Sequence, residues 1–185
     1  LYSYYHYQTD YVEDVNGKVK LIDYMQTYLK VGEVDSVLEA GTGIDRPPAF
    51  GHKQYLGLDI STKVCSILKD KGIPHKHGCA SVSIRALDDS FDLCLAYDIL
   101  NHMTSTRLYI FLEECSQRCR YLLAAVDTRN DLRSDILSKR LTINHVDLHP
   151  TVMNMSEWND YLKPYFECQS KQLGPWIYIF GKTKG

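Results

Sequence analysis

The stretch VDSVLEAGTGIDRPPAFGHKQYLGLDI, residues 34–60, decides how the rest of the chain is interpreted. It contains two short apolar runs, 34–40 and 54–60, that are typical of buried parallel strands. The glycine turn Gly41-Thr42-Gly43 follows the first run, and Asp59 lies near the end of the second. Glycines at a strand end allow the backbone to approach a ligand closely, and a carboxylate at the end of the next strand can accept both hydroxyls of a ribose. The stretch therefore predicts an adenosine-binding site.

The spacing of the glycines argues against a nicotinamide cofactor. The dinucleotide fingerprint G-x-G-x-x-G would place a third glycine at position 46, where this chain has Arg46. We therefore expect a different ligand that contains adenosine.

Outward from this stretch, hydrophobic period and breaking residues predict alternating strands and helices. The expected elements are a helix at 18–29, a helix capped by Ser61 and ended by Gly72, a weak strand at 74–79, a strand at 91–100, a helix through Cys115 and Cys119, a strand at 121–127, a helix capped by Ser156, and a hairpin with strands at 167–173 and 176–180. This order implies a mostly parallel sheet covered on both faces, with its ligand at the carboxyl ends of the strands.

Composition predicts an ordinary soluble, globular chain. The 185 residues carry 21 Lys and Arg against 23 Asp and Glu, a formal charge of −2, and 44% are hydrophobic. A near-neutral chain has no general basic field, so nucleic acid is not the favoured partner. No run of about 18 apolar residues is present, so we expect no membrane span.

The six cysteines are expected to be reduced thiols in a cytoplasmic protein. Cys65, Cys94, Cys115 and Cys119 lie in apolar segments, and the sequence has no C-x-x-C pair. Cys115 and Cys119, four residues apart on the predicted helix, are the best metal candidates. We interpret them as packing residues, because no second ligand pair has zinc spacing, and no metal site is expected.

Four motifs resemble a known family. VLEAGTG at 37–43, YLGLDIS at 55–61, GCA at 78–80 and FDLCLAYDILNHM at 91–103 are similar, in this order and spacing, to the successive motifs of class I, Rossmann-like S-adenosylmethionine-dependent methyltransferases. The tail, SEW at 156–158 followed by GPWIYIFGK at 174–182, fits as well. The resemblance implies one domain with a three-layer α/β/α sandwich, and a mostly parallel seven-stranded sheet whose last strand is antiparallel.

The resemblance also implies S-adenosylmethionine as cofactor, S-adenosylhomocysteine as product, and a role for each matching residue. Glu39 would contact the methionine amino end, and Gly41, Thr42 and Gly43 would form the floor under it. Asp59 would hold the ribose hydroxyls, and Ile60 would flank the adenine. Cys79 and Ala80 would take the place of an acidic residue that reaches the adenine amino group. Asp98 would lie with His102 beside the departing methyl group, and a helix cap is the equal alternative for Asp98.

Two departures from the family pattern affect the site. Asp45 replaces the third glycine and Pro47-Pro48 follows, so the helix that usually starts there must be short, displaced or absent. The Asn- or Asp-Pro-Pro-aromatic tetrapeptide of base-amino methyltransferases is missing, because this chain has Tyr97-Asp98-Ile99-Leu100. Methylation of an exocyclic base amine is therefore not expected.

The sequence thus predicts a methyltransferase that acts by in-line displacement on a small or medium polar acceptor, more readily at oxygen than at nitrogen. Its parts would be a lid and helix at 1–30, a cofactor core at 34–127, a substrate-side excursion at 128–155, and a helix with a hairpin at 156–185. The candidates for a general base are His102, Asp98 and His149.

A cluster of tyrosines near the start of the printed chain is expected to lie over the site. Tyr4, Tyr5 and Tyr7 would form a lid, with His145 on the substrate side, and an aromatic strap packed on the core is the equal alternative.

Two other functions stay open. One is a catalytically weak or inactive methyltransferase-like partner subunit. The other is an RNA or DNA methyltransferase with a local basic rim at Arg129, Arg133, Lys139 and Arg140.

Overall fold

The computed structural model describes residues 15–51, 53–128 and 150–184. Its helices are α2 (Val15–Met25), α3 (Thr62–Asp70), α4 (Ala80–Ser83), α5 (Ser105–Arg118) and α7 (Met155–Leu162). Its strands are β1 (Ser36–Ala40), β2 (Gln54–Asp59), β3 (His75–His77), β4 (Phe91–Tyr97), β5 (Cys119–Asp127), β6 (Phe166–Leu173) and β7 (Trp176–Thr183).

The strands form one seven-stranded sheet in the order β3-β2-β1-β4-β5-β7-β6. The pairs from β3 to β5 are parallel, whereas β7 runs antiparallel to both β5 and β6. The predicted Rossmann-like fold, including its antiparallel last strand, is confirmed. From β1 the chain continues through β2 and β3 on one side, and then returns to β4 on the other side of β1, so the strand order reverses between β1 and β4. In open α/β sheets a ligand binds at the carboxyl ends of the strands at such a switch point.

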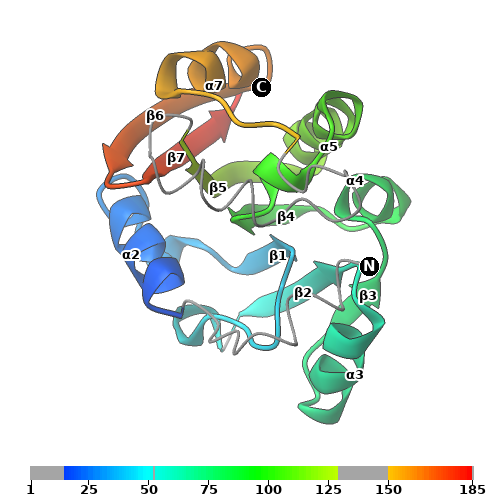
Figure 1. Cartoon of the computed structure of the whole chain (residues 1–185). Helices are drawn as coiled ribbons and strands as arrows, with labels where there is room; N and C mark the ends of the chain where they lie inside the picture. The colour runs from blue at the N-terminus through cyan, green and yellow to red at the C-terminus, as the bar shows by residue number, and fades with distance from the viewer. Residues whose placement is uncertain (1–14, 52, 129–149, 185) are drawn as a thin grey trace.

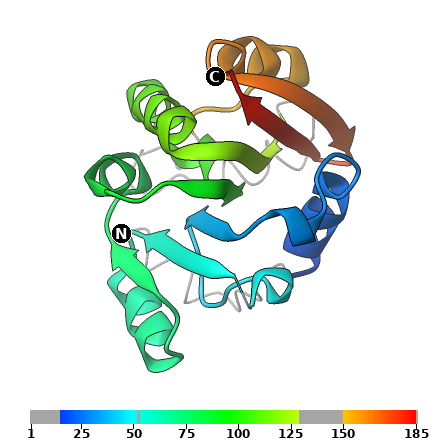
Figure 2. The ribbon, with the colours of Figure 1, turned by 180° about the vertical axis from the view of Figure 1, so that it is seen from behind.

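Helices cover both faces of the sheet (Figures 1 and 2). On one face, Leu108 and Phe111 of α5 and Trp158 of α7 share a buried apolar cluster with Leu38 and other sheet residues. On the other face, α2 packs against the sheet, and its Leu21 and Met25 are fully buried. Alternation along β1 explains the split, since successive side chains of a strand point to opposite faces.

Several predicted boundaries move by a few residues. The first described helix is Val15–Met25 instead of 18–29, and the strand predicted at 91–100 ends at Tyr97. Cys119 was expected on a helix but begins β5, because α5 ends at Arg118.

The last helix is capped by Asn154 and not by Ser156. The Asn154 side chain accepts from Glu157 N at 3.0 Å, and Glu157 Oε2 accepts from Asn154 N at 2.8 Å. This reciprocal capping box starts the helix two residues earlier than predicted. The Ser61 cap is confirmed, because its hydroxyl accepts from Val64 N at 3.3 Å.

Among the described residues, no helix combines the length and the apolar character that crossing a membrane requires.

Candidate functional site

The glycine turn at the end of β1 has the backbone that its sequence predicts. Gly41 and Gly43 have φ values of +69° and +68°, a region that glycine enters without steric cost. Gly41 also has a neighbour that excludes a larger residue, because an added Cβ would lie 3.0 Å from side-chain carbons of Ile99. Its N–H donates to Leu58 O at 2.8 Å, which ties the turn to β2.

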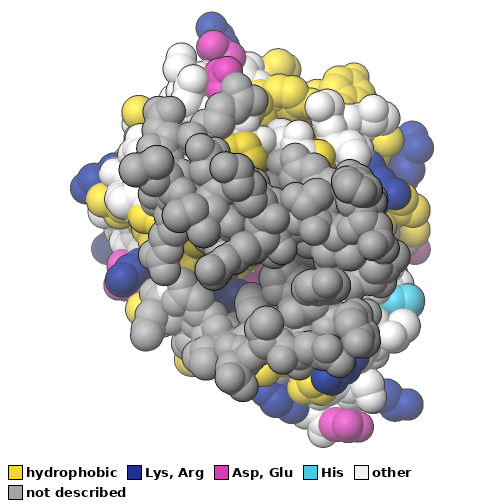
Figure 3. All heavy atoms as spheres, viewed as in Figure 1, with side chains coloured by type: hydrophobic (Ala, Val, Ile, Leu, Met, Phe, Trp, Pro, Cys, Tyr) yellow, Lys and Arg dark blue, Asp and Glu magenta, His cyan; other side chains and the backbone are white. Residues whose placement is uncertain are grey.

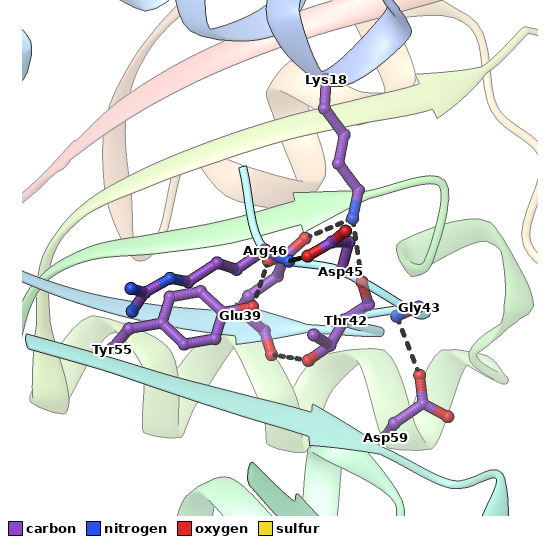
Figure 4. Close-up of polar contacts among 8 residues, drawn as sticks. All are labelled: Lys18, Glu39, Thr42, Gly43, Asp45, Arg46, Tyr55 and Asp59. Carbon is purple, nitrogen blue, oxygen red and sulfur yellow. Dashed lines mark hydrogen bonds and ion pairs between the residues drawn. The ribbon is translucent and has the colours of Figure 1, made fainter. Parts of the chain in front are cut away.

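Asp59 connects the end of β2 to this turn. Its Oδ2 accepts from Gly43 N at 3.1 Å (Figure 4), and its Oδ1 accepts from Ser61 N at 2.8 Å. The residue is only 9% exposed, and burial raises the pKa of its carboxyl, although the two backbone donors oppose the shift. The predicted ribose acid and the predicted glycine floor are therefore held together by a direct hydrogen bond.

Glu39 is fully buried and has two charged or polar partners. Lys18 Nζ of α2 lies 2.8 Å from Glu39 Oε1, and the Tyr55 hydroxyl donates to Oε2 at 2.5 Å. Lys18 Nζ also donates to Thr42 O at 2.9 Å (Figure 4). Burial raises the pKa of Tyr55 well above its ordinary value, and the adjacent Glu39 adds to the shift. Tyr55 is therefore a neutral donor, and the charged groups of this cluster are Lys18 and Glu39.

Lys18 and Tyr55 were not among the predicted site residues, yet the sequence held a signal for Lys18. It precedes Leu21, Ile22 and Met25 by three, four and seven residues, so it lies on the apolar stripe of its helix. A lysine on a buried stripe needs a buried acid. Glu39, within an apolar strand, was the available acid.

Gly57 makes room for the glycine turn from the neighbouring strand. It pairs with Glu39 in the register of β1 and β2. A Cβ added at Gly57 would lie 2.2 Å from Thr42 Oγ1 and 2.9 Å from Thr42 Cγ2. Thr42 is fully buried, so its side chain occupies the space that a larger residue 57 would need.

At the end of β4, Asp98 has a left-handed backbone with a φ of +51°. Its N–H donates to Ala125 O at 3.0 Å, and its Oδ1 accepts from Asn101 Nδ2 at 2.9 Å. Thr104, and not Asp98, is the N-cap residue of α5. His102 follows in the 3-10 turn Leu100–His102 and is partly exposed. A non-glycine residue with positive φ is uncommon and clusters at functional sites.

The third expected contact region lies around β3 and α4. Cys79 occupies the N-cap position of α4 without a side-chain cap, and its Sγ lies 3.2 Å from the Ser81 hydroxyl. Ala80 is buried. Ile60, after β2, is 50% exposed and offers an apolar surface beside Asp59.

The structure thus brings Glu39, the glycine turn and Asp59 into one connected network. The shortened helix after the turn is also found, because only a 3-10 turn, Pro48–Phe50, follows Pro47. Five predicted site residues lie outside the described residues: Tyr4, Tyr5, Tyr7, His145 and His149.

Two other features lie apart from this network. A groove of about 550 Å³ between α5 and α7 is lined by Ser105, Pro150, Thr151, Val152, Met153, Glu157, Asp160 and Tyr161. The Sγ atoms of Cys94, Cys115 and Cys119 lie within 4.8 Å of one another. Cys65 and these three cysteines are all buried, which agrees with their predicted packing role. Cys94 joins the pair that the sequence had singled out.

Comparisons with known proteins agree with this architecture. Residues 38–121 match the family model described as a methyltransferase domain. Among curated proteins, the sequence comparison finds no match.

Solved structures of other proteins share the fold. One is an O-methyltransferase family protein from Burkholderia thailandensis (15% identity, TM-score 0.62, 92% of this chain and 57% of that chain). Another is human N-acetylserotonin methyltransferase in complex with S-adenosylmethionine (16%, 0.68, 95% and 53%). The PH0226 protein from Pyrococcus horikoshii (15%, 0.68, 98% and 99%) is a third. The chain spans a little more than half of the first two of these proteins and almost all of the third.

Residues 38–121 therefore resemble a methyltransferase domain, and the sheet order is that of the Rossmann-like fold. The resemblance to methyltransferases that the sequence motifs predicted is confirmed over these residues.

The residues at the strand ends fit the adenosine part of S-adenosylmethionine. A carboxylate has about four lone-pair sites, and the hydrogen bonds from Gly43 N and Ser61 N use two of those of Asp59. Capacity for two ribose hydroxyls therefore remains on a side chain that is largely out of water. Glu39 differs, because an ammonium group of a ligand would have to approach it alongside Lys18.

Proposed function

We propose that the protein transfers a methyl group from S-adenosylmethionine to a small or medium polar acceptor, at oxygen in preference to nitrogen. The observation that carries this proposal is the hydrogen bond from Gly43 N to Asp59 at the ends of two adjacent parallel strands. It joins the two parts that an adenosine cofactor requires, a close backbone floor and a ribose acceptor.

The cofactor would supply an activated methyl group that passes to the acceptor by in-line displacement. The protein's own contribution is then mainly alignment. Asp59 fixes the ribose, the glycine turn permits close approach, and Ile60 covers one side of the base. His102 or Asp98, at the end of β4, would accept a proton from an acceptor hydroxyl, with His149 as a further candidate.

Two features support oxygen as the acceptor atom. The segment Tyr97-Asp98-Ile99-Leu100 lacks the prolines and the aromatic residue of base-amino methyltransferases. The Burkholderia protein with a similar fold is an O-methyltransferase family member. A cytoplasmic location is part of the proposal, because all six cysteines, which lie in the described residues, are free thiols.

Calorimetric titration with S-adenosylmethionine and S-adenosylhomocysteine tests the proposal. We expect saturable binding of both ligands to the unmodified protein. Asp59→Ala should lose at least tenfold in affinity, since hydrogen bonds to a charged group contribute about 1.5–3 kcal/mol. Asp89→Ala should bind with unchanged affinity. Asp89 is an exposed carboxylate in the loop before β4 and serves as the matched control. Absence of heat with either ligand at about a millimolar, a concentration at which even a weak site of −4 kcal/mol is half filled, would contradict the proposal.

A second candidate function is a methyltransferase-like module without catalysis. It is favoured by the internal pairing of Glu39 with Lys18 and Tyr55, which leaves this acid already neutralised. Such a module would bind the cofactor but consume none with any pool of acceptors, and it would copurify with a larger enzyme.

Nucleic acid gains no support from the described residues on the face shown in Figure 3. On the face shown in Figure 3, the described Lys and Arg side chains are spread around the rim and do not gather into one patch. The basic residues singled out for this reading, Arg129, Arg133, Lys139 and Arg140, lie outside the described residues. Salt-dependent retention on an oligonucleotide would be required to revive it.

A further inference from the structure

A lysine from α2 reaches the glycine turn from outside the segment that matches the family model. Lys18 is 6% exposed, lies 20 residues before residue 38, where that match begins, and contacts both the Glu39 carboxylate at 2.8 Å and the Thr42 carbonyl at 2.9 Å. Figure 4 shows the side chain descending from α2 onto the turn. Burial of an ammonium group is costly, and the pairing with Glu39 compensates for it. The result is a fixed positive charge beside the loop.

This loop has lost the usual source of positive potential for an anionic ligand. A helix that begins after a glycine turn presents free N–H groups and the positive end of its dipole. Here Pro47 and Pro48 have no N–H group, and only the 3-10 turn Pro48–Phe50 follows. The N–H groups of Gly43 and Arg46 already donate to the carboxylates of Asp59 and Asp45.

Arg46 is the other cation in this region, and it points elsewhere. Its guanidinium carbon lies 5.6 Å from the centre of the Tyr55 ring, and in Figure 4 the side chain extends along Tyr55, away from Thr42. Of the two cations drawn there, only Lys18 contacts the glycine turn.

We propose that Lys18 is a cofactor-binding residue that recognises the carboxylate of the amino-acid end of the cofactor. This inference rests on the proposed function and deepens it. The amino-acid end of S-adenosylmethionine carries an ammonium and a carboxylate group. The buried pair presents a carboxylate, Glu39, and an ammonium, Lys18, so the two zwitterionic units can lie head to tail with each charge next to its opposite. Lys18 thereby replaces the missing helix N-terminus.

An alternative role of Lys18 predicts the opposite change in cofactor affinity when the lysine is removed. If Lys18 occupied the place of the cofactor's ammonium group on Glu39, it would compete with the cofactor, and its removal would tighten binding. Measurements on Lys18 variants therefore separate the two roles.

The test compares S-adenosylmethionine with decarboxylated S-adenosylmethionine, which lacks only the carboxylate. We expect the unmodified protein to bind the intact cofactor on the order of tenfold more tightly, the contribution of one charge-assisted contact. In Lys18→Met this preference should disappear, whereas Lys18→Arg should keep most of it. Lys20→Met, an exposed lysine on the same helix, is the matched control and should keep all of it.

A second variant protects the test against misfolding, because Lys18→Met alone leaves Glu39 buried without its cation. The double variant Lys18→Met with Glu39→Gln removes both charges together, and its melting temperature reports the fold. We expect it to bind both ligands equally. If Lys18 served only to neutralise Glu39, this double variant would regain the preference, which would overturn the inference.

The remaining outcomes are distinguishable. No binding of either ligand to the unmodified protein overturns the proposed function and this inference together. Binding of both ligands without a preference, or a preference that survives in Lys18→Met, overturns this inference alone. Tighter binding of intact cofactor by Lys18→Met overturns it in favour of competition.

Discussion

Replacement of Gly57 by alanine should distort the glycine turn from the neighbouring strand. The added Cβ would lie 2.2 Å from Thr42 Oγ1, whereas ordinary contact begins at 3.4 Å, so a fully buried side chain must retreat by more than an ångström. Overpacking of this kind costs about 1–3 kcal/mol. The lower entropy of the unfolded alanine chain returns about 0.5–1 kcal/mol.

The net destabilisation of Gly57→Ala should therefore be up to about 2.5 kcal/mol, which is a fall in Tm of up to roughly 10 °C for a chain of this size. Thr42→Ala alone should cost about 1 kcal/mol, because it removes a buried methyl group. In the double variant, the two shortest of these contacts, with Thr42 Oγ1 and Cγ2, are removed, and the contact with the Cβ of residue 42, at 3.1 Å, remains. Gly57→Ala should then cost almost nothing in the Thr42→Ala background, so the coupling free energy should be close to its cost in the unmodified protein, up to about 2.5 kcal/mol.

Urea unfolding of the four proteins in this cycle measures the coupling. Cofactor titration of the same set reports whether the turn moves. The affinity for the cofactor should fall further in Gly57→Ala than in Thr42→Ala. Equal effects of Gly57→Ala in both backgrounds, within about 0.5 kcal/mol, would refute the steric argument.

Three further results are expected. Burial raises the pKa of Asp59 above 3.8, and only the ionised carboxyl accepts both ribose hydroxyls. Cofactor affinity measured by calorimetry should therefore fall as the pH is lowered through that raised pKa. A pH profile of affinity as flat as that of Asp59→Ala would contradict this role. Asp98→Asn keeps a side-chain oxygen for Asn101 and tolerates the left-handed backbone, so Tm should change by less than about 2 °C while methyl transfer slows; unchanged turnover would remove Asp98 from the catalytic candidates. An aromatic disulfide reagent should react first with Cys79 and more slowly with Cys168, because burial raises the pKa of Cys168 to about 11. The four buried thiols should react only after unfolding. Rapid reaction of more than two thiols in the folded protein would show that the core is open.

The sheet and the proximity of the glycine turn to Asp59 could be predicted because their signals are local. The apolar runs, the glycine turn and Asp59 lie within 27 consecutive residues, and parallel pairing brings the two strand ends together. The Asn154 cap was also readable, since Asn154 and Glu157 have capping-box spacing. The polar Ser156, two residues later, drew the prediction away from it.

The Lys18–Glu39–Tyr55 cluster could not be assembled in the same way. Its members lie on a helix and two strands, and the contact depends on how α2 packs on the sheet. Cys94 joined the cysteine pair for the same reason, because β4 lies against the end of α5 only in the folded chain. The left-handed backbone of Asp98 had only a weak local signal, since aspartate is enriched at positive φ but adopts it in a minority of cases.

The ion pair between Lys18 and Glu39 also has a consequence for where the domain begins. The segment recognised by family resemblance, residues 38–121, includes the acid and excludes its base. A gene fragment cut to the borders of that resemblance would encode a buried carboxylate without its counter-ion, and it would also lack β6 and β7. The segment that matches the family model is therefore shorter than the segment that this chain needs to pair the buried charge of Glu39.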